Sequence, residues 1–150
     1  MQSFELWYPT PDVPEFLAGA FVAQRDAEGM LVVCDGEFEN GRCAVLAFDH
    51  PEAVVVHEEF AHQWPLGADL GMPPRSKGSQ FAFPFLMIVN SEWAKNCRRF
   101  AAFDELPIHY CIISLDNAVD ILSIDPPKVL WASPDEINEL FDLASRLGEA

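Results

Sequence analysis

The residues best suited to chemistry in this chain form one short string, His57-Glu58-Glu59-Phe60-Ala61-His62. Imidazole nitrogen and carboxylate oxygen are ligands that zinc and other divalent ions take from proteins. We therefore predict His57, Glu58 and His62 as candidate metal ligands, with a divalent metal such as zinc as the implied cofactor. Under this hypothesis the chain is a metal-dependent hydrolase, and a flexible loop of residues 65–80 closes over the site.

The string resembles the HExxH motif of zinc proteases, but its two histidines are five residues apart rather than four. On a helix this spacing rotates His62 by ~140° from His57, and on a strand it places the two side chains on opposite faces. Some metallopeptidase families have the longer spacing, within a long helix and with further ligands downstream. Here three valines precede the string, so a solvated strand end without any cofactor is the favoured interpretation.

Other catalytic signatures are missing from the sequence. It contains no GxSxG nucleophile elbow, no GxGxxG or GxxxxGK[ST] phosphate loop and no CxxC pair. His109 is expected to be a half-buried core histidine, and Asp116 and Asp120 are expected at a turn, where acids form local hydrogen bonds. The cysteines are expected to be free buried thiols: Cys34, Cys43, Cys97 and Cys111. These features favour a protein that is not an enzyme.

Charge limits the partners that the chain can bind. Its 150 residues include 24 Asp and Glu against 9 Lys and Arg, which gives a formal net charge of −15. Such a surface repels phosphate backbones and anionic lipid headgroups, so neither nucleic acid nor a membrane is an expected partner. The plainest partner is a basic protein. Aromatic side chains surrounded by acids suit the contact surface of such a partner, and we predict Trp7, Tyr8 and Trp64 for this role.

The sequence also predicts a cytoplasmic location. No cationic segment followed by an apolar stretch is present at the N-terminus, as a secretory signal would require. The longest apolar run, residues 81–89, is far shorter than the ~20 residues of a membrane-spanning helix.

Patterning predicts a single globular domain over residues 1–150, with about six to eight strands. A short helical turn is expected at the start of residues 15–24, followed by a strand, and Asn40-Gly41 predicts a type I′ hairpin turn. Apolar or alternating runs that suit strands lie at 4–8, 20–25, 30–34, 42–48, 53–60, 81–89, 108–115, 119–123 and 129–131. The first half of the chain is therefore expected to form an antiparallel meander.

Two principal helices are predicted, near 91–103 and 134–147. Ser91 suits the N-cap of the first helix, and Ser133-Pro134-Asp135-Glu136 is a capping box with proline at the first helical position of the second. Because strands and helices do not alternate regularly along the chain, we expect an α+β fold with a mainly antiparallel sheet.

Together these features predict a non-catalytic, acidic protein-binding module. Immunity proteins that neutralise nuclease toxins, and other inhibitors that cover a basic partner, share this general profile, although no residue motif supports the likeness. The metal-dependent hydrolase is one alternative. A structural subunit of a homo-oligomer, with its aromatic residues buried between copies, is the other.

Overall fold

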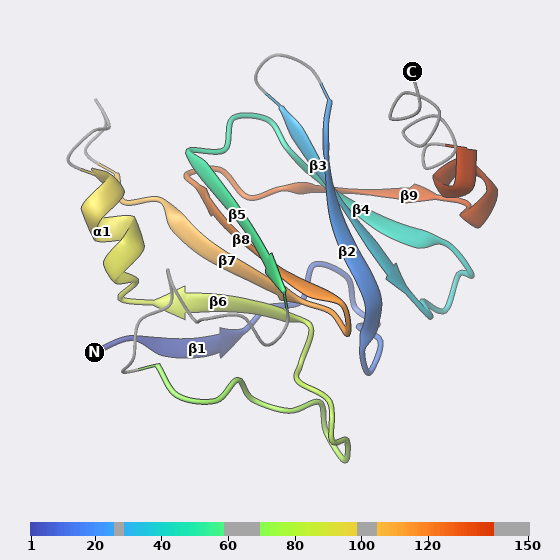
Figure 1. Ribbon diagram of the computed structural model, residues 1–150, viewed down its shortest axis with the longest axis horizontal. Helices are drawn as coiled ribbons and strands as arrows, with labels where there is room; N and C mark the ends of the chain where they lie inside the picture. Colours follow the sequence, from blue (N-terminus) through green and yellow to red (C-terminus); the bar gives the residue numbers. More distant parts are fainter. Residues whose placement is uncertain (26–28, 59–69, 99–104, 140–150) are drawn as a thin grey trace.

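Nine strands form two antiparallel sheets in the computed structural model (Figure 1), which describes residues 1–25, 29–58, 70–98 and 105–139. The five-stranded sheet has the order β1-β6-β7-β8-β5, with β1 (Ser3–Leu6), β6 (Phe85–Val89), β7 (Ile108–Ile113), β8 (Asn117–Ser123) and β5 (Ala53–Glu58). The four-stranded sheet has the order β2-β3-β4-β9, with β2 (Leu17–Gln24), β3 (Met30–Gly36), β4 (Cys43–Phe48) and β9 (Lys128–Ala132).

The predicted α+β fold with a mainly antiparallel sheet is confirmed in outline, but the expected six to eight strands are too few. The single meander expected in the first half of the chain is also wrong. Of the first five strands described, β2, β3 and β4 follow one another in one sheet, whereas β1 and β5 belong to the other sheet. Helix α1 covers Glu92–Arg98, and residues 134–139 are helical. The remaining parts of the two predicted helices, 99–103 and 140–147, lie outside the described residues.

An aromatic cluster fills the space between the two sheets. Tyr110 of β7 contacts Phe48 of β4, with ring centroids 5.5 Å apart, and Trp7, with centroids 4.7 Å apart. Trp7 also meets Phe85 edge-on at 5.8 Å. Tyr110, Phe48 and Phe85 are almost completely buried, so this side of the five-stranded sheet faces the four-stranded sheet and forms the main core.

The two sheets are joined by the side chain of Asn117, at the start of β8. The Ala20 backbone N–H donates to Asn117 Oδ1 (3.3 Å), and Asn117 Nδ2 donates to the Ala20 carbonyl. Beside them the Leu115 N–H donates to the Leu17 carbonyl (2.9 Å). The outer edge of β2 is therefore bonded to the turn between β7 and β8.

Two local predictions are wrong for backbone reasons. Residues 17–24 form strand β2, bonded along β3 with a β-bulge between Leu17 and Gly19, and no helical turn precedes the strand. A type I′ turn needs positive φ at both Asn40 and Gly41. Only Gly41 has it (φ 71°), and its N–H donates to the Phe38 carbonyl (3.0 Å), so the turn spans residues 38–41 with the left-handed residue at its end.

The predicted loop at 65–80 is described only from Leu70 onwards. Within that part Ser76 is buried, and its hydroxyl donates to the Glu15 carbonyl (2.6 Å). Arg75 forms an isolated β-bridge with Ala82. These contacts attach residues 75 and 76 to the body of the domain. In the described part of the chain no helix has the length and apolar character needed to cross a membrane.

Candidate functional site

A continuous chain of hydrogen bonds crosses the five-stranded sheet. Ser91 Oγ lies 2.7 Å from His109 Nδ1, and His109 Nε2 lies 2.7 Å from Asp120 Oδ1. The other carboxylate oxygen, Asp120 Oδ2, lies 2.8 Å from His57 Nε2. We call these four residues, Ser91, His109, Asp120 and His57, the Asp120 network.

Strand register places the network on one face of the sheet. Asp120 of β8 pairs with Cys111 of β7, so His109, two residues before Cys111, is its diagonal neighbour on the same face. His57 of β5 pairs with Ala118, two residues before Asp120, and is the diagonal neighbour on the other side. Tyr110, which alternates with His109, points into the core between the sheets. The network therefore lies on the face turned away from the four-stranded sheet.

A sharp turn between β6 and α1 positions Ser91. Asn90 has a left-handed backbone (φ 58°) and reverses the chain immediately after β6. The Ala94 N–H then donates to Ser91 Oγ (3.1 Å), and the Lys95 N–H donates to the Ser91 carbonyl (3.1 Å). The prediction that Ser91 caps this helix is confirmed. From the first turn of α1, the Trp93 ring meets the His109 imidazole edge-on, with centroids 5.1 Å apart.

The charge at the centre of the network is fixed by its hydrogen bonds. Asp120 is completely buried, and burial alone would raise its pKa, but the hydrogen bonds and charges of His109 and His57 lower the pKa below its ordinary value. The ionised carboxylate therefore accepts an N–H from each imidazole. With its proton on Nε2, a neutral His109 has a free lone pair on Nδ1, which accepts the Ser91 hydroxyl proton.

Stability should depend on pH in two directions because of this arrangement. The hydrogen bond to Asp120 raises the His57 pKa above 6.5, so its contribution is complete below pH 6.5 and is lost as the pH rises through the raised pKa. The Asp120 pKa lies below 3.8, so its contribution is complete above pH 3.8 and is lost as the pH falls through the lowered pKa. The free energy of unfolding, measured with urea, should therefore be constant between pH 3.8 and pH 6.5.

The His57→Gln variant tests the alkaline side of that plateau. Its free energy of unfolding should no longer fall as the pH rises above 6.5, whereas His50→Gln, at an exposed histidine outside the network, should retain the wild-type fall. An unchanged pH profile in His57→Gln would refute the assignment of the alkaline limb to the His57–Asp120 pair.

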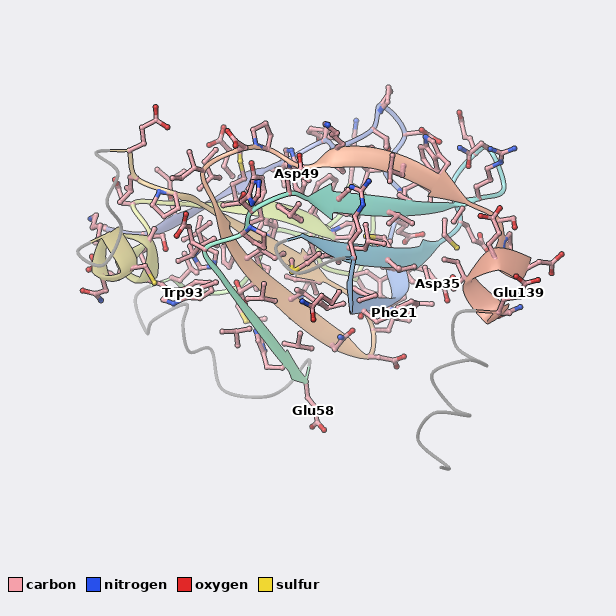
Figure 2. The ribbon with its side chains drawn as sticks, turned by 90° about the horizontal axis from the view of Figure 1, so that it is seen from above. Phe21, Asp35, Asp49, Glu58, Trp93 and Glu139 are labelled. Carbon is pink, nitrogen blue, oxygen red and sulfur yellow. The ribbon has the colours of Figure 1, made fainter. Side chains whose placement is uncertain are left out.

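The structure separates two of the three predicted metal ligands. His57 Nε2 is bonded to Asp120, and His57 Nδ1 lies 3.3 Å from the Glu58 carbonyl oxygen. Because strand side chains alternate, Glu58 lies on the opposite face from His57, and Figure 2 shows its carboxylate extending outward from the end of β5. His62 lies outside the described residues. Among the residues that the structure does describe, no three His, Cys, Asp or Glu side chains are grouped to hold a metal ion.

The predicted aromatic anchors lie in different surroundings. Trp7 is half-buried and packs on Phe85 and Tyr110. Tyr8 is 58% exposed, and its ring meets Phe83 edge-on at 5.3 Å. Trp64 lies outside the described residues. Of the two that are described, Tyr8 is the one whose ring is mainly exposed to solvent.

All four cysteines are free thiols, as predicted. Cys34, Cys43 and Cys111 are buried, whereas Cys97 is partly exposed. Burial raises the pKa of the Cys34 and Cys111 thiols well above the ordinary value, so both stay protonated at neutral pH. Neither is a nucleophile in this structure.

Sequence reasoning missed the network itself. Asp120 was expected to border a turn and to form local hydrogen bonds there, but it lies in the middle of β8, is completely buried and bonds to two histidines of other strands. His109 was expected to be half-buried and is instead 1% exposed. A usable signal was present, because each is a polar residue inside an apolar run, in IHYCII and in NAVDILS. Buried polar side chains need partners, and two such residues on neighbouring strands could have been matched to each other.

Comparison with known proteins gives no indication of function, so any proposal for this chain depends on the geometry and charge of its own residues. No protein-family model, curated protein or solved structure matches this chain.

A cavity of about 300 Å³ adjoins the Asp120 network. Ser91 and His109 both contribute to its wall, together with Glu5 of β1. The remaining lining is mainly apolar and comes from β6, the start of α1 and the segment that enters β7: Met87, Ile88, Val89, Asn90, Ala94, Leu106, Pro107 and Ile108. Two members of the Asp120 network, Ser91 and His109, are thus among the residues that line the cavity.

Carboxylates gather at one end of the four-stranded sheet. The connection from β3 to β4 and the helical residues 134–139 meet there, because Cys43 at the start of β4 pairs with Ala132 at the end of β9. We call this surface the acidic end, and its exposed carboxylates are Asp35, Glu37, Glu39, Asp135, Glu136 and Glu139. Figure 2 shows Asp35 and Glu139 at the opposite end of the molecule from Trp93. Arg42 is the exposed cation in the same connection.

Part of the acidic end is held rigidly by the predicted capping box. The Glu136 N–H donates to Ser133 Oγ (3.2 Å), and the Ser133 N–H donates to Glu136 Oε1 (3.4 Å). Ile137 is buried against Val33, Cys43 and Val45 of the sheet. The capping box is confirmed, and it fixes the direction in which this turn of helix leaves β9.

Proposed function

We propose that this chain binds a basic protein through its acidic surface, in the manner of an immunity protein or another inhibitor. The observation that supports this is the excess of exposed carboxylates that have no ion pair with a cation in the described part of the chain. Among the described residues, Arg25 and Lys128 both pair with Asp49, and Lys95 pairs with Glu92. None of the six carboxylates of the acidic end has an ion pair with a described Lys or Arg.

The physical basis is electrostatic complementarity. Surface carboxylates attract a positively charged surface over a distance that the ionic strength sets. This attraction raises the association rate constant more than it raises the equilibrium affinity. Tyr8 belongs to the proposed contact surface as an aromatic anchor, since its exposed ring can be buried by a partner. Trp7 contributes mainly to the core.

Native mass spectrometry of the untagged protein, purified gently from its own source, tests the proposal first. We expect a stoichiometric complex with a basic companion chain. A bound divalent ion at full occupancy would instead support the hydrolase of the His57, Glu58 and His62 string, and a homo-oligomer without a companion would support the structural subunit. Either result would contradict the proposed function.

Association of that companion should depend strongly on salt. Because steering is screened at high ionic strength, we expect the association rate constant to fall by at least ~10-fold between low and high salt. The Glu37→Lys/Glu39→Lys variant should show a slower association and a shallower salt dependence in stopped-flow or biosensor measurements.

The matched control is the Glu52→Lys/Glu58→Lys variant. It makes the same change in net charge at exposed positions before and at the end of β5, away from the acidic end. Equal loss in both variants would show that net charge alone matters, and the proposed use of the acidic end would be refuted.

A further inference from the structure

We propose that Ser91, His109 and Asp120 form a catalytic triad that hydrolyses small carboxylic esters bound in the adjoining cavity. This activity goes beyond the proposed binding of a basic protein and uses a different part of the molecule. The acidic end and the cavity are separate surfaces, so the two proposals can succeed or fail independently.

The geometry has the three relationships that such a triad requires. A nucleophile lies within hydrogen-bond reach of a base, with Ser91 Oγ 2.7 Å from His109 Nδ1. The base is oriented by a buried carboxylate, with His109 Nε2 2.7 Å from Asp120 Oδ1. The second oxygen of that carboxylate is held by His57 (2.8 Å), which prevents Asp120 from turning away from His109.

The protonation pattern is the one that general-base catalysis needs. The Asp120 carboxylate holds the His109 proton on Nε2, which leaves the Nδ1 lone pair directed at the Ser91 hydroxyl. Serine oxygen has two lone pairs. One accepts the Ala94 N–H (3.1 Å), and the other is available for attack on a carbonyl carbon.

Local structure presents the serine in a way that a sequence motif would not reveal. The chain passes from β6 through the left-handed Asn90 to Ser91 and then into α1, which is a strand–turn–helix arrangement. Nucleophile elbows usually have a glycine two residues before and two residues after the serine. Here the left-handed residue Asn90, directly before Ser91, makes the turn. In addition, His109 faces the serine through Nδ1 rather than Nε2. A triad is recognised by geometry and roles, so neither difference prevents the chemistry.

The cavity determines the class of substrate. Its volume of about 300 Å³ is at the small end of the range for ligand sites, and its lining is mainly apolar. Ser91 is only 2% exposed, and it is one of the residues that line this cavity. Glu5, an exposed acidic residue of β1, also lines the cavity, and its negative charge disfavours anions. The fitting substrate is a short-chain ester that has no negative charge.

The reaction balances with water as the second substrate. Ser91 Oγ attacks the ester carbonyl carbon while its proton moves to His109 Nδ1. The ester C–O bond then breaks, and the alcohol leaves with that proton. Water next attacks the acyl group on Ser91 and gives a proton to His109 Nδ1, and the Ser91 oxygen leaves with that proton. The products are one carboxylic acid and one alcohol.

The test uses the wild-type chain with two probes: a small fluorophosphonate, which phosphonylates activated serines, and p-nitrophenyl acetate. We expect a single adduct by intact mass, located at Ser91 by peptide mapping, and p-nitrophenol release faster than in buffer alone. A singly negative ester, p-nitrophenyl hydrogen succinate, should react more slowly than the acetate. A folded wild-type chain with no adduct at Ser91, or with an adduct only at another residue, would overturn the proposal.

Variants separate catalysis from structure. His109→Gln should lower the rate of labelling by at least ~10²-fold, the usual contribution of a general base. Ser133→Ala is the matched control, because Ser133 also caps a helix but its hydroxyl is bonded to Glu136 and to none of the described histidines, and it should label like the wild type. If His109→Gln does not fold, the pH profile of wild-type labelling decides. Labelling should fall as the imidazole base is protonated, and a rate without that dependence would refute the role of His109.

Discussion

The Asp120→Ala variant is expected to lose about 3–5 kcal/mol of the free energy of unfolding, the usual result of removing one partner of a buried charged pair. Asp120 accepts hydrogen bonds from both His109 and His57, and its side chain is completely buried. Alanine leaves both imidazole N–H groups without an acceptor and opens a cavity beside Cys111. Urea or guanidinium unfolding followed by tryptophan fluorescence measures the loss.

Asp116→Ala provides the control for this effect. Asp116 is exposed in the turn immediately before β8, and removal of its carboxylate should change stability by no more than about 0.5 kcal/mol. If the two alanine variants were equally stable, the Asp120 network would have no structural role, and the wild-type pH plateau should then be absent as well.

The Asn117→Ala variant is expected to be the second most damaging, with a loss of about 2–3 kcal/mol for unsatisfied backbone groups. It removes both hydrogen bonds to Ala20 and one of the two acceptors of the Ser114 hydroxyl, Asn117 Oδ1 (2.7 Å); the other acceptor, the Asn117 backbone carbonyl (2.9 Å), stays. Because this side chain joins β2 to the β7–β8 turn, hydrogen exchange should accelerate in residues 17–20 more than elsewhere. Asn96→Ala, at an exposed position in α1, should keep both properties near wild type.

A different outcome for Asn117→Ala would also be informative. If hydrogen exchange accelerated uniformly over both sheets, the contact between Asn117 and β2 would not open locally. Strand β2 would then open only when the whole domain unfolds.

Much of the secondary structure could be predicted from the sequence because apolar runs between turn residues define strands directly. Each of the nine runs that suit strands overlaps an observed strand, and the expected count of six to eight understated them. The same approach failed at residues 15–24, where Phe and Leu at i,i+4 suggested a helical turn. Pairing of β2 with β3 overrides that local preference. Hydrogen bonds to a neighbouring strand outweigh intrinsic helix propensity, and they cannot be seen in one segment alone.

The candidate site was harder to predict because its members are far apart in sequence. Ser91, His109 and Asp120 meet only through the register of β7 with β8 and the turn after β6. The one short string of potential metal ligands, which begins at His57, suggested a metal site because its spacing is close to that of HExxH. The structure instead directs His57 to Asp120, 63 residues away. Proximity along the chain was therefore a poor guide to proximity in space.

The two proposals make different demands on the domain. Binding of a basic protein needs the exposed carboxylates of the acidic end and is sensitive to salt. Ester hydrolysis needs the buried hydrogen bonds among Ser91, His109 and Asp120. Its rate should change little with salt, because charges removed from solvent are weakly screened. A variant of the acidic end that loses its partner but still labels at Ser91 would show that the two functions are independent.

Asn117 has a consequence for solubility. A strand at the border of a sheet offers unpaired N–H and C=O groups, and another chain can add to it edge to edge. On β2 the amide of Asn117 pairs with both polar backbone groups of Ala20, as a neighbouring strand would. One side chain thus occupies the position where a second copy would attach. Its loss should increase self-association and fibril formation as well as unfolding.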